Sequence, residues 1–172
     1  MRAAVVGGGP AGLMAAETLL AQGVGVDLYD AKPSVGRKFL LAGKGGLNLT
    51  HSESFEPFVA RFAERAESLR PWLRDFDGPA LRAWAEGLGI STFVGSSGRV
   101  FPTDMKAAPL LRAWLQRLRA AGLRLHMRSH WLGWTDDGAL RFAGPEGEFT
   151  AQADATVLAL GGGSWPQLGS DG

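Results

Sequence analysis

The chain begins with the sequence MRAAVVGGGPAG, residues 1–12, in which a short apolar run passes through three glycines into a segment typical of a helix. Gly7 permits a tight turn out of a strand, Gly9 lets the backbone approach a pyrophosphate, and Gly12 allows helix and strand to pack closely. The amides at the start of the helix would then face the phosphates. This stretch predicts one half of a dinucleotide-binding unit.

A carboxylate follows at the position where such a unit needs one. Asp30 ends the next apolar run, residues 24–29, and lies 18 residues after Gly12. A carboxylate there is expected to accept hydrogen bonds from a ribose 2′-hydroxyl, so a free 2′-hydroxyl fits and a 2′-phosphate does not. Strand, turn, helix and second strand follow in order within about 30 residues, as the motif requires. A glycine turn without a ligand stays open as the alternative.

Composition excludes several classes of function. The 172 residues suit one domain, and 45% apolar content is ample for a core. The 18 basic and 17 acidic residues form no basic stripe, so we expect no nucleic-acid partner. The absence of cysteine excludes disulfides and thiolate chemistry, and no His or carboxylate cluster has metal-ligand spacing. Without a signal peptide or a long apolar stretch, we expect a cytoplasmic protein that binds no membrane.

Apolar periodicity and turn residues predict the order of the elements. Residues 31–54 are glycine-rich and are expected to form a loop without regular structure. The expected helices, after the first, are residues 55–69, 79–88 and 105–121, with breaks at Arg70-Pro71-Trp72 and Asp77-Gly78-Pro79. The expected strands are residues 90–94 and 99–101 as a hairpin, 123–127, three short antiparallel strands at 130–135, 139–143 and 148–153, and a buried parallel strand at 156–160.

These elements predict an α/β fold with a Rossmann-like parallel sheet, in which an antiparallel meander replaces a crossover helix. The chain ends in a glycine-rich turn at residues 169–172, which is an unusual end for a protein. We therefore expect a piece of a longer protein and a sheet that is incomplete at its C-terminal side.

Four further motifs, in order, resemble the BaiN/RdsA family of bacterial NAD(P)/FAD-dependent oxidoreductases, which have two dinucleotide-binding domains. They are GRK at 36–38, AGKGGLNLT at 42–50, GRVFP at 98–102 and ALGGGSWP at 159–166. The resemblance implies the N-terminal part of an FAD-binding domain, with a helical and hairpin segment over about 55–105. It also implies an inserted substrate domain and a C-terminal FAD-domain segment beyond residue 172.

The loop sequence GKGGLNLT is similar to that of an uncharacterised subgroup, because Gly46-Leu47 stands where the wider family has an Arg-Cys pair. The resemblance implies roles for single residues. The FAD pyrophosphate is expected at Gly7, Gly9, Pro10, Ala11 and Gly12, and the adenosine ribose at Asp30, with Ala31 beside it. Further cofactor-binding residues are expected to be Gly36, Arg37, Lys38, Gly43, Gly45, Gly46, Asn48, Ala159, Leu160 and Gly161, of which Gly43–Asn48 would pass beside the flavin ring.

The reaction that the resemblance implies is hydride transfer to or from the flavin, with the cofactor supplying the reactivity. No second Gly-x-Gly-x-x-Gly follows a strand, so NAD(P)H is expected as a transient electron donor. Lys44 is either a positive charge near the reduced flavin or a solvated lysine. His51 is either an acid–base group or a structural loop residue. Arg99 with Lys106 either receives an anion or caps the hairpin and the next helix.

Two other functions stay open at this point. The first is a flavin- or nucleotide-binding module without catalysis, because no side chain stands out as catalytic. The second is an NAD-dependent Rossmann dehydrogenase, which the meander and the glycine-rich loop favour less than an FAD protein. The substrate, which is expected to be a small molecule, and the oligomeric state are not predicted.

Overall fold

The computed structural model describes residues 1–163 and forms two compact units. The first combines Met1–Leu41 with the chain from Leu115 onward, and the second is Ala42–Trp114. Chain length alone predicts one domain, and the helical and hairpin segment expected at about 55–105 lies within the second unit. No helix of the described residues is both long and apolar enough to cross a membrane.

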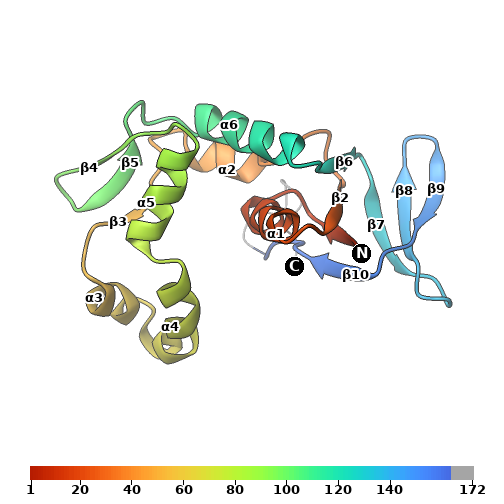
Figure 1. The fold of residues 1–172 in the computed structure, drawn as a ribbon, viewed down its shortest axis with the longest axis horizontal. Coiled ribbons are helices and arrows are strands. Elements are labelled where there is room, and N and C mark those ends of the chain that lie inside the picture. The colour runs from red at the N-terminus through yellow and green to blue at the C-terminus, as the bar shows by residue number, and fades with distance from the viewer. Residues whose placement is uncertain (164–172) are drawn as a thin grey trace. The chain divides into compact units, whose positions relative to one another are not determined.

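The first unit is built on a parallel sheet with the strand order β10-β1-β2-β6 (Figure 1). Its strands are β1 (Arg2–Val6), β2 (Gly25–Asp30), β6 (Arg124–Met127) and β10 (Ala155–Leu158). The helix α1 (Pro10–Ala21) connects β1 to β2. In register, Val6 pairs with Tyr29 on one side and with Leu158 on the other. The prediction of an α/β fold with a Rossmann-like parallel sheet is confirmed.

Strand β1 is apolar from Ala3 to Val6 because both of its faces are covered there. Successive side chains of a strand point to opposite faces, so an alternating pattern would leave one face for water. Ala4 and Val6 belong to a buried cluster with Tyr29 on one face, and Val5 lies on the other, beside α1. The side chains from Ala3 to Val6 are at most 3% exposed. The glycine turn therefore begins from a rigid strand.

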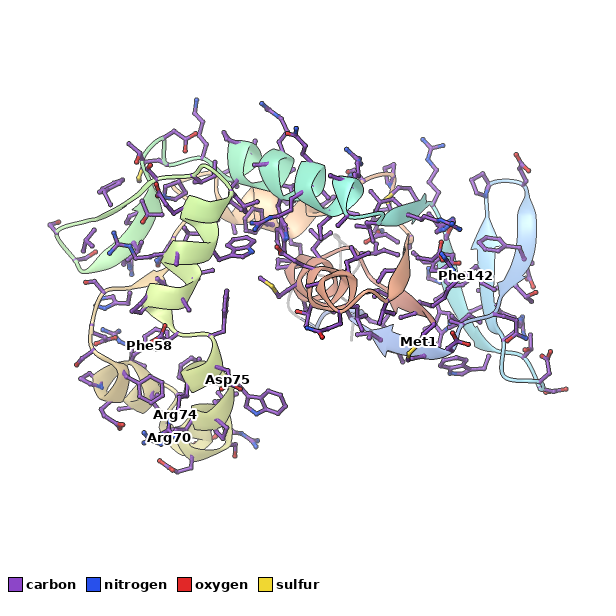
Figure 2. The ribbon with its side chains drawn as sticks, viewed as in Figure 1. Met1, Phe58, Arg70, Arg74, Asp75 and Phe142 are labelled. Carbon is purple, nitrogen blue, oxygen red and sulfur yellow. The ribbon has the colours of Figure 1, made fainter. Side chains whose placement is uncertain are left out.

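A three-stranded antiparallel meander joins β6 to β10, as predicted (Figure 1). It consists of β7 (His130–Trp134), β8 (Leu140–Gly144) and β9 (Gly147–Ala151). Phe142 of β8, labelled in Figure 2, stacks on Tyr29 of β2 with ring centroids 4.3 Å apart. Leu140 and Phe142 are buried in the same cluster as Ala4 and Val6. The meander thus covers the face of the sheet that a crossover helix would otherwise cover.

Strand β10 differs from its prediction in burial. It pairs in parallel with β1, as expected, but Leu158 is 47% and Leu160 49% exposed. The reason is its position, because β10 is an edge strand of the sheet that the described residues form. An apolar run is buried on both faces only where neighbours cover both. The expectation of a buried strand is therefore wrong for the described residues.

The second unit combines helices with a small antiparallel sheet of order β3-β5-β4. Its strands are β3 (Thr50–His51), β4 (Thr92–Val94) and β5 (Arg99–Pro102), so the predicted hairpin is confirmed. Its helices include α3 (Phe55–Ala60), α4 (Ala66–Asp75) and α5 (Gly78–Gly87). The helix α6 (Ala107–Ala120) begins in this unit and buries Leu110, Leu111, Trp114 and Leu118, at the spacings that predicted it.

Three of the predicted boundaries are wrong. Residues 31–54 contain a short helix, α2 (Arg37–Ala42), which follows Gly36 at φ +68° and is too short to produce a recognisable period. The helix expected at 55–69 ends at Ala60 and resumes at Ala66 after a 3₁₀ turn (Ala63–Arg65) whose first residue, Ala63, has φ +47°. Met105 at φ +62° delays α6 to Ala107.

The break predicted at Arg70-Pro71-Trp72 is also wrong, because Pro71 lies inside α4. A proline within a helix lacks one amide hydrogen bond and usually kinks or ends the helix. Here the neighbouring Arg70, labelled in Figure 2, forms ion pairs with Glu67 at 2.9 Å and with Glu56 at 2.7 Å. The break at Asp77-Gly78-Pro79 is confirmed, because Asp77 accepts a hydrogen bond from the Ala80 amide at 2.8 Å and caps α5.

Candidate functional site

Two glycines of the N-terminal turn are required by the fold itself. Gly7 has φ +109°, and a Cβ there would overlap the carbonyl oxygen of Ala159 and lie 2.8 Å from its carbonyl carbon. A Cβ on Gly12 would overlap the carbonyl oxygen of Gly7. The Gly7 amide donates to the carbonyl of Tyr29 at 2.8 Å. These contacts fix the turn whether or not a ligand is bound.

Gly9 has no such reason to be glycine. Its φ of −78° and ψ of −178° are extended backbone that any residue adopts, and a Cβ there would have no heavy atom of residues 1–163 within 4 Å. Gly9 is the N-cap of α1, yet no side chain caps the helix and its first turn holds no acidic residue. Serine, threonine, asparagine or aspartate would be the usual N-cap. The space over the helix start is therefore open.

The start of α1 presents backbone donors to this space. The first α-helical hydrogen bond runs from the Leu13 amide to the Gly9 carbonyl at 2.9 Å, and Pro10 has no N–H. The amides of Ala11 and Gly12 thus precede the helical ladder. Unpaired amides and the helix dipole together favour an anion at this end. The residues predicted to bind the pyrophosphate thus lie together at a helix start that favours an anion.

Asp30 ties the end of β2 to the glycine turn. Its Oδ2 accepts from the Gly8 amide at 2.6 Å and its Oδ1 accepts from the Lys32 amide at 2.7 Å. The Gly36 amide in turn donates to the carbonyl of Gly8 at 2.8 Å, and Val35 is buried against Gly8. A carboxylate oxygen has more than one acceptor site, so these bonds leave capacity for a ribose hydroxyl. The sequence indicated a contact between Asp30 and the ribose, but it did not indicate the hydrogen bond between the Asp30 carboxylate and the Gly8 amide.

Four of the predicted cofactor residues lie on the segment that follows β2. Ala31 and Arg37 are exposed, Lys38 is half-buried, and Gly36 is buried beside Gly8. Arg37 and Lys38 form the first turn of α2. The hydrogen bond between Gly36 and Gly8 brings this segment to the glycine turn.

The last described strand brings Ala159, Leu160 and Gly161 to the same place. The Ala159 amide donates to the carbonyl of Val6 at 2.8 Å, and Gly161 has φ +90°. The chain leaves β1 toward β2 on one side and returns to β10 on the other. The carboxyl ends of β1 and β10 therefore border a topological switch point, which is where open α/β sheets bind ligands.

The second glycine-rich stretch, Gly43–Asn48, belongs to the other unit. A Cβ on Gly43 would lie 2.6 Å from the Cβ of Ala107, and one on Gly46, at φ +115°, would lie 2.6 Å from Met105 Cε. The amide of the buried Leu47 donates to the carbonyl of Met105 at 2.9 Å. Internal packing therefore accounts for two of the three glycines. A Cβ on Gly45 would meet nothing within 4 Å.

The two candidates for catalysis, Lys44 and His51, differ in their surroundings. Lys44 is exposed and forms no ion pair with any described residue. His51 is partly buried, with Nε2 3.0 Å from the carbonyl of Ser97 and Nδ1 accepting from the Glu53 amide at 3.3 Å. A Cβ on Gly98 would lie 2.6 Å from the ring of His51. These contacts support the structural interpretation of His51, and Lys44 is available to a ligand.

An electrostatic cluster lies at the other end of the parallel sheet. Asp27 of β2 accepts from Arg2, and from His126 Nε2 at 2.8 Å. Burial raises the pKa of the Asp27 carboxyl, but the bonds from Arg2 and His126 lower it more, so its pKa lies below the ordinary value of 3.8. Tyr29 stacks on His126 with centroids 4.5 Å apart. This cluster joins β1, β2 and β6 and was not foreseen.

Comparisons with known proteins agree with this architecture. A family model described as "HI0933-like protein Rossmann domain" matches residues 1–172. THI4 of Thermovibrio ammonificans is 18% identical with a TM-score of 0.58, over 93% of this chain and 57% of THI4. The 3-ketosteroid-Δ4-(5α)-dehydrogenase of Rhodococcus jostii RHA1 is 14% identical with a TM-score of 0.67, over 93% of this chain and 45% of the dehydrogenase.

A flavocytochrome c3 fumarate reductase is 18% identical with a TM-score of 0.61, over 94% of this chain and 33% of the reductase. At these identities the likeness concerns the fold alone. The chain spans about half the length of the first two solved structures and about a third of the reductase.

Proposed function

The chain belongs to the family of HI0933-like Rossmann domains, and from this premise we propose that it binds FAD and is part of an NAD(P)H-linked flavoprotein oxidoreductase. The observation that carries the proposal is the open space at Gly9. The fold requires Gly7 and Gly12, whereas the described part of the chain leaves space for a side chain at Gly9. A bound pyrophosphate supplies the missing reason for glycine at that position.

The residues present fit the adenosine and pyrophosphate half of FAD. The amides of Ala11 and Gly12 would donate to the pyrophosphate at the N-terminus of α1. Asp30 would accept from a ribose hydroxyl while it continues to hold the Gly8 amide. Ala159, Leu160 and Gly161 would border the cofactor at the switch point. An adenosine carrying a 2′-phosphate would place two negative charges together at Asp30, which disfavours NADP as the resident nucleotide.

The second unit would supply residues for the flavin. Gly43–Asn48 would pass beside the ring, and the open space at Gly45 suits a close approach of the ligand to the backbone. Lys44 would place a positive charge there. When bound, the flavin supplies the capacity to accept and donate a hydride. The protein's part is to bind and orient it, with NAD(P)H as a transient electron donor and a substrate of unidentified chemistry.

The binding proposal is tested with Gly9→Ser, which separates folding from ligand binding. Serine fits the open space and is a favoured N-cap, so we expect the unfolding midpoint to stay the same or rise. The same hydroxyl occupies the pyrophosphate space and takes up one helix amide. We expect affinity for FAD, titrated up to millimolar concentration, to fall about tenfold, the equivalent of one charge-assisted hydrogen bond.

The matched control is Ala21→Ser, which adds the same side chain at the exposed C-terminal end of α1 and should leave FAD affinity unchanged. Equal FAD affinities of the wild-type chain and Gly9→Ser would contradict the proposed pyrophosphate site. NAD serves as competitor in the same titration. If NAD displaced FAD at equal concentration, an NAD-dependent Rossmann dehydrogenase would be the better assignment.

The redox part of the proposal has its own test. The FAD-loaded protein is mixed with NADH or NADPH without oxygen, and the visible absorbance of the flavin is followed. Rapid bleaching is expected with one of the two nucleotides. Flavin that stays oxidised with both would favour a module that binds FAD without catalysis.

A further inference from the structure

The second unit contains an open cleft of about 420 Å³ that shares one lining residue, Asn48, with the FAD proposal. Every residue that lines it lies between Asn48 and Arg99, so the cleft belongs to this unit alone. Its walls come from β3, β5 and the helices α3, α4 and α5. The volume lies within the range of small-molecule sites, which combine mainly apolar walls with a few polar groups.

The helical walls of the cleft are apolar. Phe58 (Figure 2), Leu73 and Leu81 line it from α3, α4 and α5, and Phe76 lines it just after α4. The ring of Phe58 is held edge-to-face by Phe62, with centroids 5.8 Å apart. Phe76 remains 41% exposed. These side chains offer a surface to an aryl or alkyl group, whose burial would be favourable.

Most of the polar groups on the remaining wall are already engaged. Arg61 forms a two-bond ion pair with Glu53, in which the longer bond is 3.2 Å. Asp77 accepts from the Ala80 amide at 2.8 Å and lies at the N-terminus of α5, where the helix dipole compensates its charge. Both ring nitrogens of His51 have partners, Nε2 at the carbonyl of Ser97 and Nδ1 at the amide of Glu53.

Arg99 is the exception. It projects from β5 and is exposed, and its side chain forms no hydrogen bond or ion pair with any described residue. Its backbone is fixed, because its carbonyl accepts from the Gly95 amide at 2.8 Å and the residue pairs with His51 in the sheet. Lys106, which the sequence grouped with Arg99, does not line the cleft. The net uncompensated charge of the cleft is therefore the positive charge of Arg99.

We propose that this cleft binds a small organic carboxylate whose anionic group pairs with Arg99 and whose aryl or alkyl body packs on Phe58, Leu73 and Leu81. A guanidinium presents a planar fork of donors that matches a carboxylate in two parallel hydrogen bonds. A neutral amide has one acceptor oxygen in place of two and no charge to compensate that of the guanidinium. An amine would meet Arg99 as a like charge, while Asp77, the only carboxylate among the described lining residues, is already engaged as a cap.

The test uses the 172-residue chain without FAD, so its outcome is independent of the proposed cofactor site. The probes are 3-phenylpropionate, its amide and 3-phenylpropylamine, which share an aryl body and differ in charge. Binding is followed through backbone amide NMR shifts. We expect saturable shifts from residues 48–51, 58–61, 73–81 and 99, with the carboxylate binding about tenfold more tightly than the amide.

Arg99→Gln is expected to reduce the affinity for the carboxylate to that for the amide and to leave the affinity for the amide unchanged. Arg112→Gln is the matched control, because it removes the same charge from an exposed position of α6 outside the cleft. Leu81→Ala should weaken the acid and the amide by the same factor, about threefold, because it shortens only the apolar wall. Retained NMR spectra verify that each variant is folded.

Three results would overturn the proposal. They are equal affinity for the acid and the amide in the wild-type chain, tighter binding of the amine, and an absence of saturable shifts at the cleft. A chain that fails to bind FAD would leave the proposal intact, since none of the cleft measurements involves the cofactor.

Discussion

The two glycine-rich stretches, Gly7–Gly12 and Gly43–Asn48, look alike in the sequence but are built on different supports. The first turns out of a buried parallel strand into a helix whose start is uncapped. The second follows a short helix and packs against the connection between β5 and α6. Only the first stands at a switch point of a parallel sheet, where fold geometry alone points to a ligand.

The stretches also share a feature, which the contacts of their glycines reveal. In each, all glycines but one are constrained by positive φ or by close contacts that a Cβ would make, and the remaining one has an ordinary conformation and open space among the described residues. Gly9 and Gly45 are these open positions. Conformational need explains most of the glycines, so only the open ones provide evidence for a ligand. The distinction between glycines that the fold requires and glycines with open space can be tested by single substitutions.

The largest effect is expected from Gly12→Ala in the first stretch. The added Cβ would overlap the carbonyl oxygen of Gly7, a backbone atom that cannot move without disturbing the turn. We expect a loss of about 3 kcal/mol of unfolding free energy, measured by urea denaturation. The gain in helix propensity from alanine, about 1 kcal/mol, offsets only part of it. A loss below about 1 kcal/mol would show that the turn relaxes easily.

Gly43→Ala tests the same principle in the second stretch, with a smaller expected effect. Its Cβ would lie 2.6 Å from the Cβ of Ala107, which is a side-chain atom, and 3.2 Å from the Ala107 amide nitrogen. We expect a loss of about 1 to 2 kcal/mol in urea denaturation. The double variant with Ala107→Gly should recover part of that loss, and strict additivity of the two changes would contradict a direct clash.

The fold of the first unit could be predicted from sequence because its signals are local. The apolar run before Gly7, the glycine spacing and the turn residues of the meander each determine one element. The clamp of Asp30 on Gly8 and the cluster at Asp27 could not be predicted in this way, because they join segments distant in sequence. The cleft at Arg99 was suggested only as an anion-receiving patch, since its apolar wall comes from three separate helices.

Strand β2 holds the first glycine turn at its C-terminal end and carries Asp27 nearer its N-terminal end. Acid that protonates Asp27 should therefore destabilise the parallel sheet that supports this turn. The folded pKa of Asp27 is below 3.8. Its contribution is complete above the unfolded pKa and is lost as the pH falls through the folded value. The unfolding free energy of the wild type should therefore decrease between about pH 6 and about pH 3. In Asp27→Asn, which has no carboxyl to protonate at this position, the decrease over the same range should be about 1 kcal/mol smaller.

Asp75→Asn is the matched control for this comparison, since it neutralises an exposed carboxyl of α4, in the other unit, that forms no ion pair among the described residues. The change in unfolding free energy between the two pH values is expected to be the same for Asp75→Asn as for the wild type. Equal responses of Asp27→Asn and Asp75→Asn would contradict the role assigned to the cluster of Asp27, Arg2 and His126.

The smallest effect, and the sharpest test of the division between required and open glycines, is expected from Gly45→Ala. Because Gly45 has open space and no positive φ, alanine should stabilise the chain by about 0.5 kcal/mol through a less flexible unfolded state. Urea denaturation beside Gly43→Ala provides the comparison. If the flavin approaches this backbone, the same variant should also bind FAD more weakly, so stability and affinity would change in opposite directions. A loss of stability would instead show that the fold requires this glycine, and Gly45 would then no longer be evidence for a ligand.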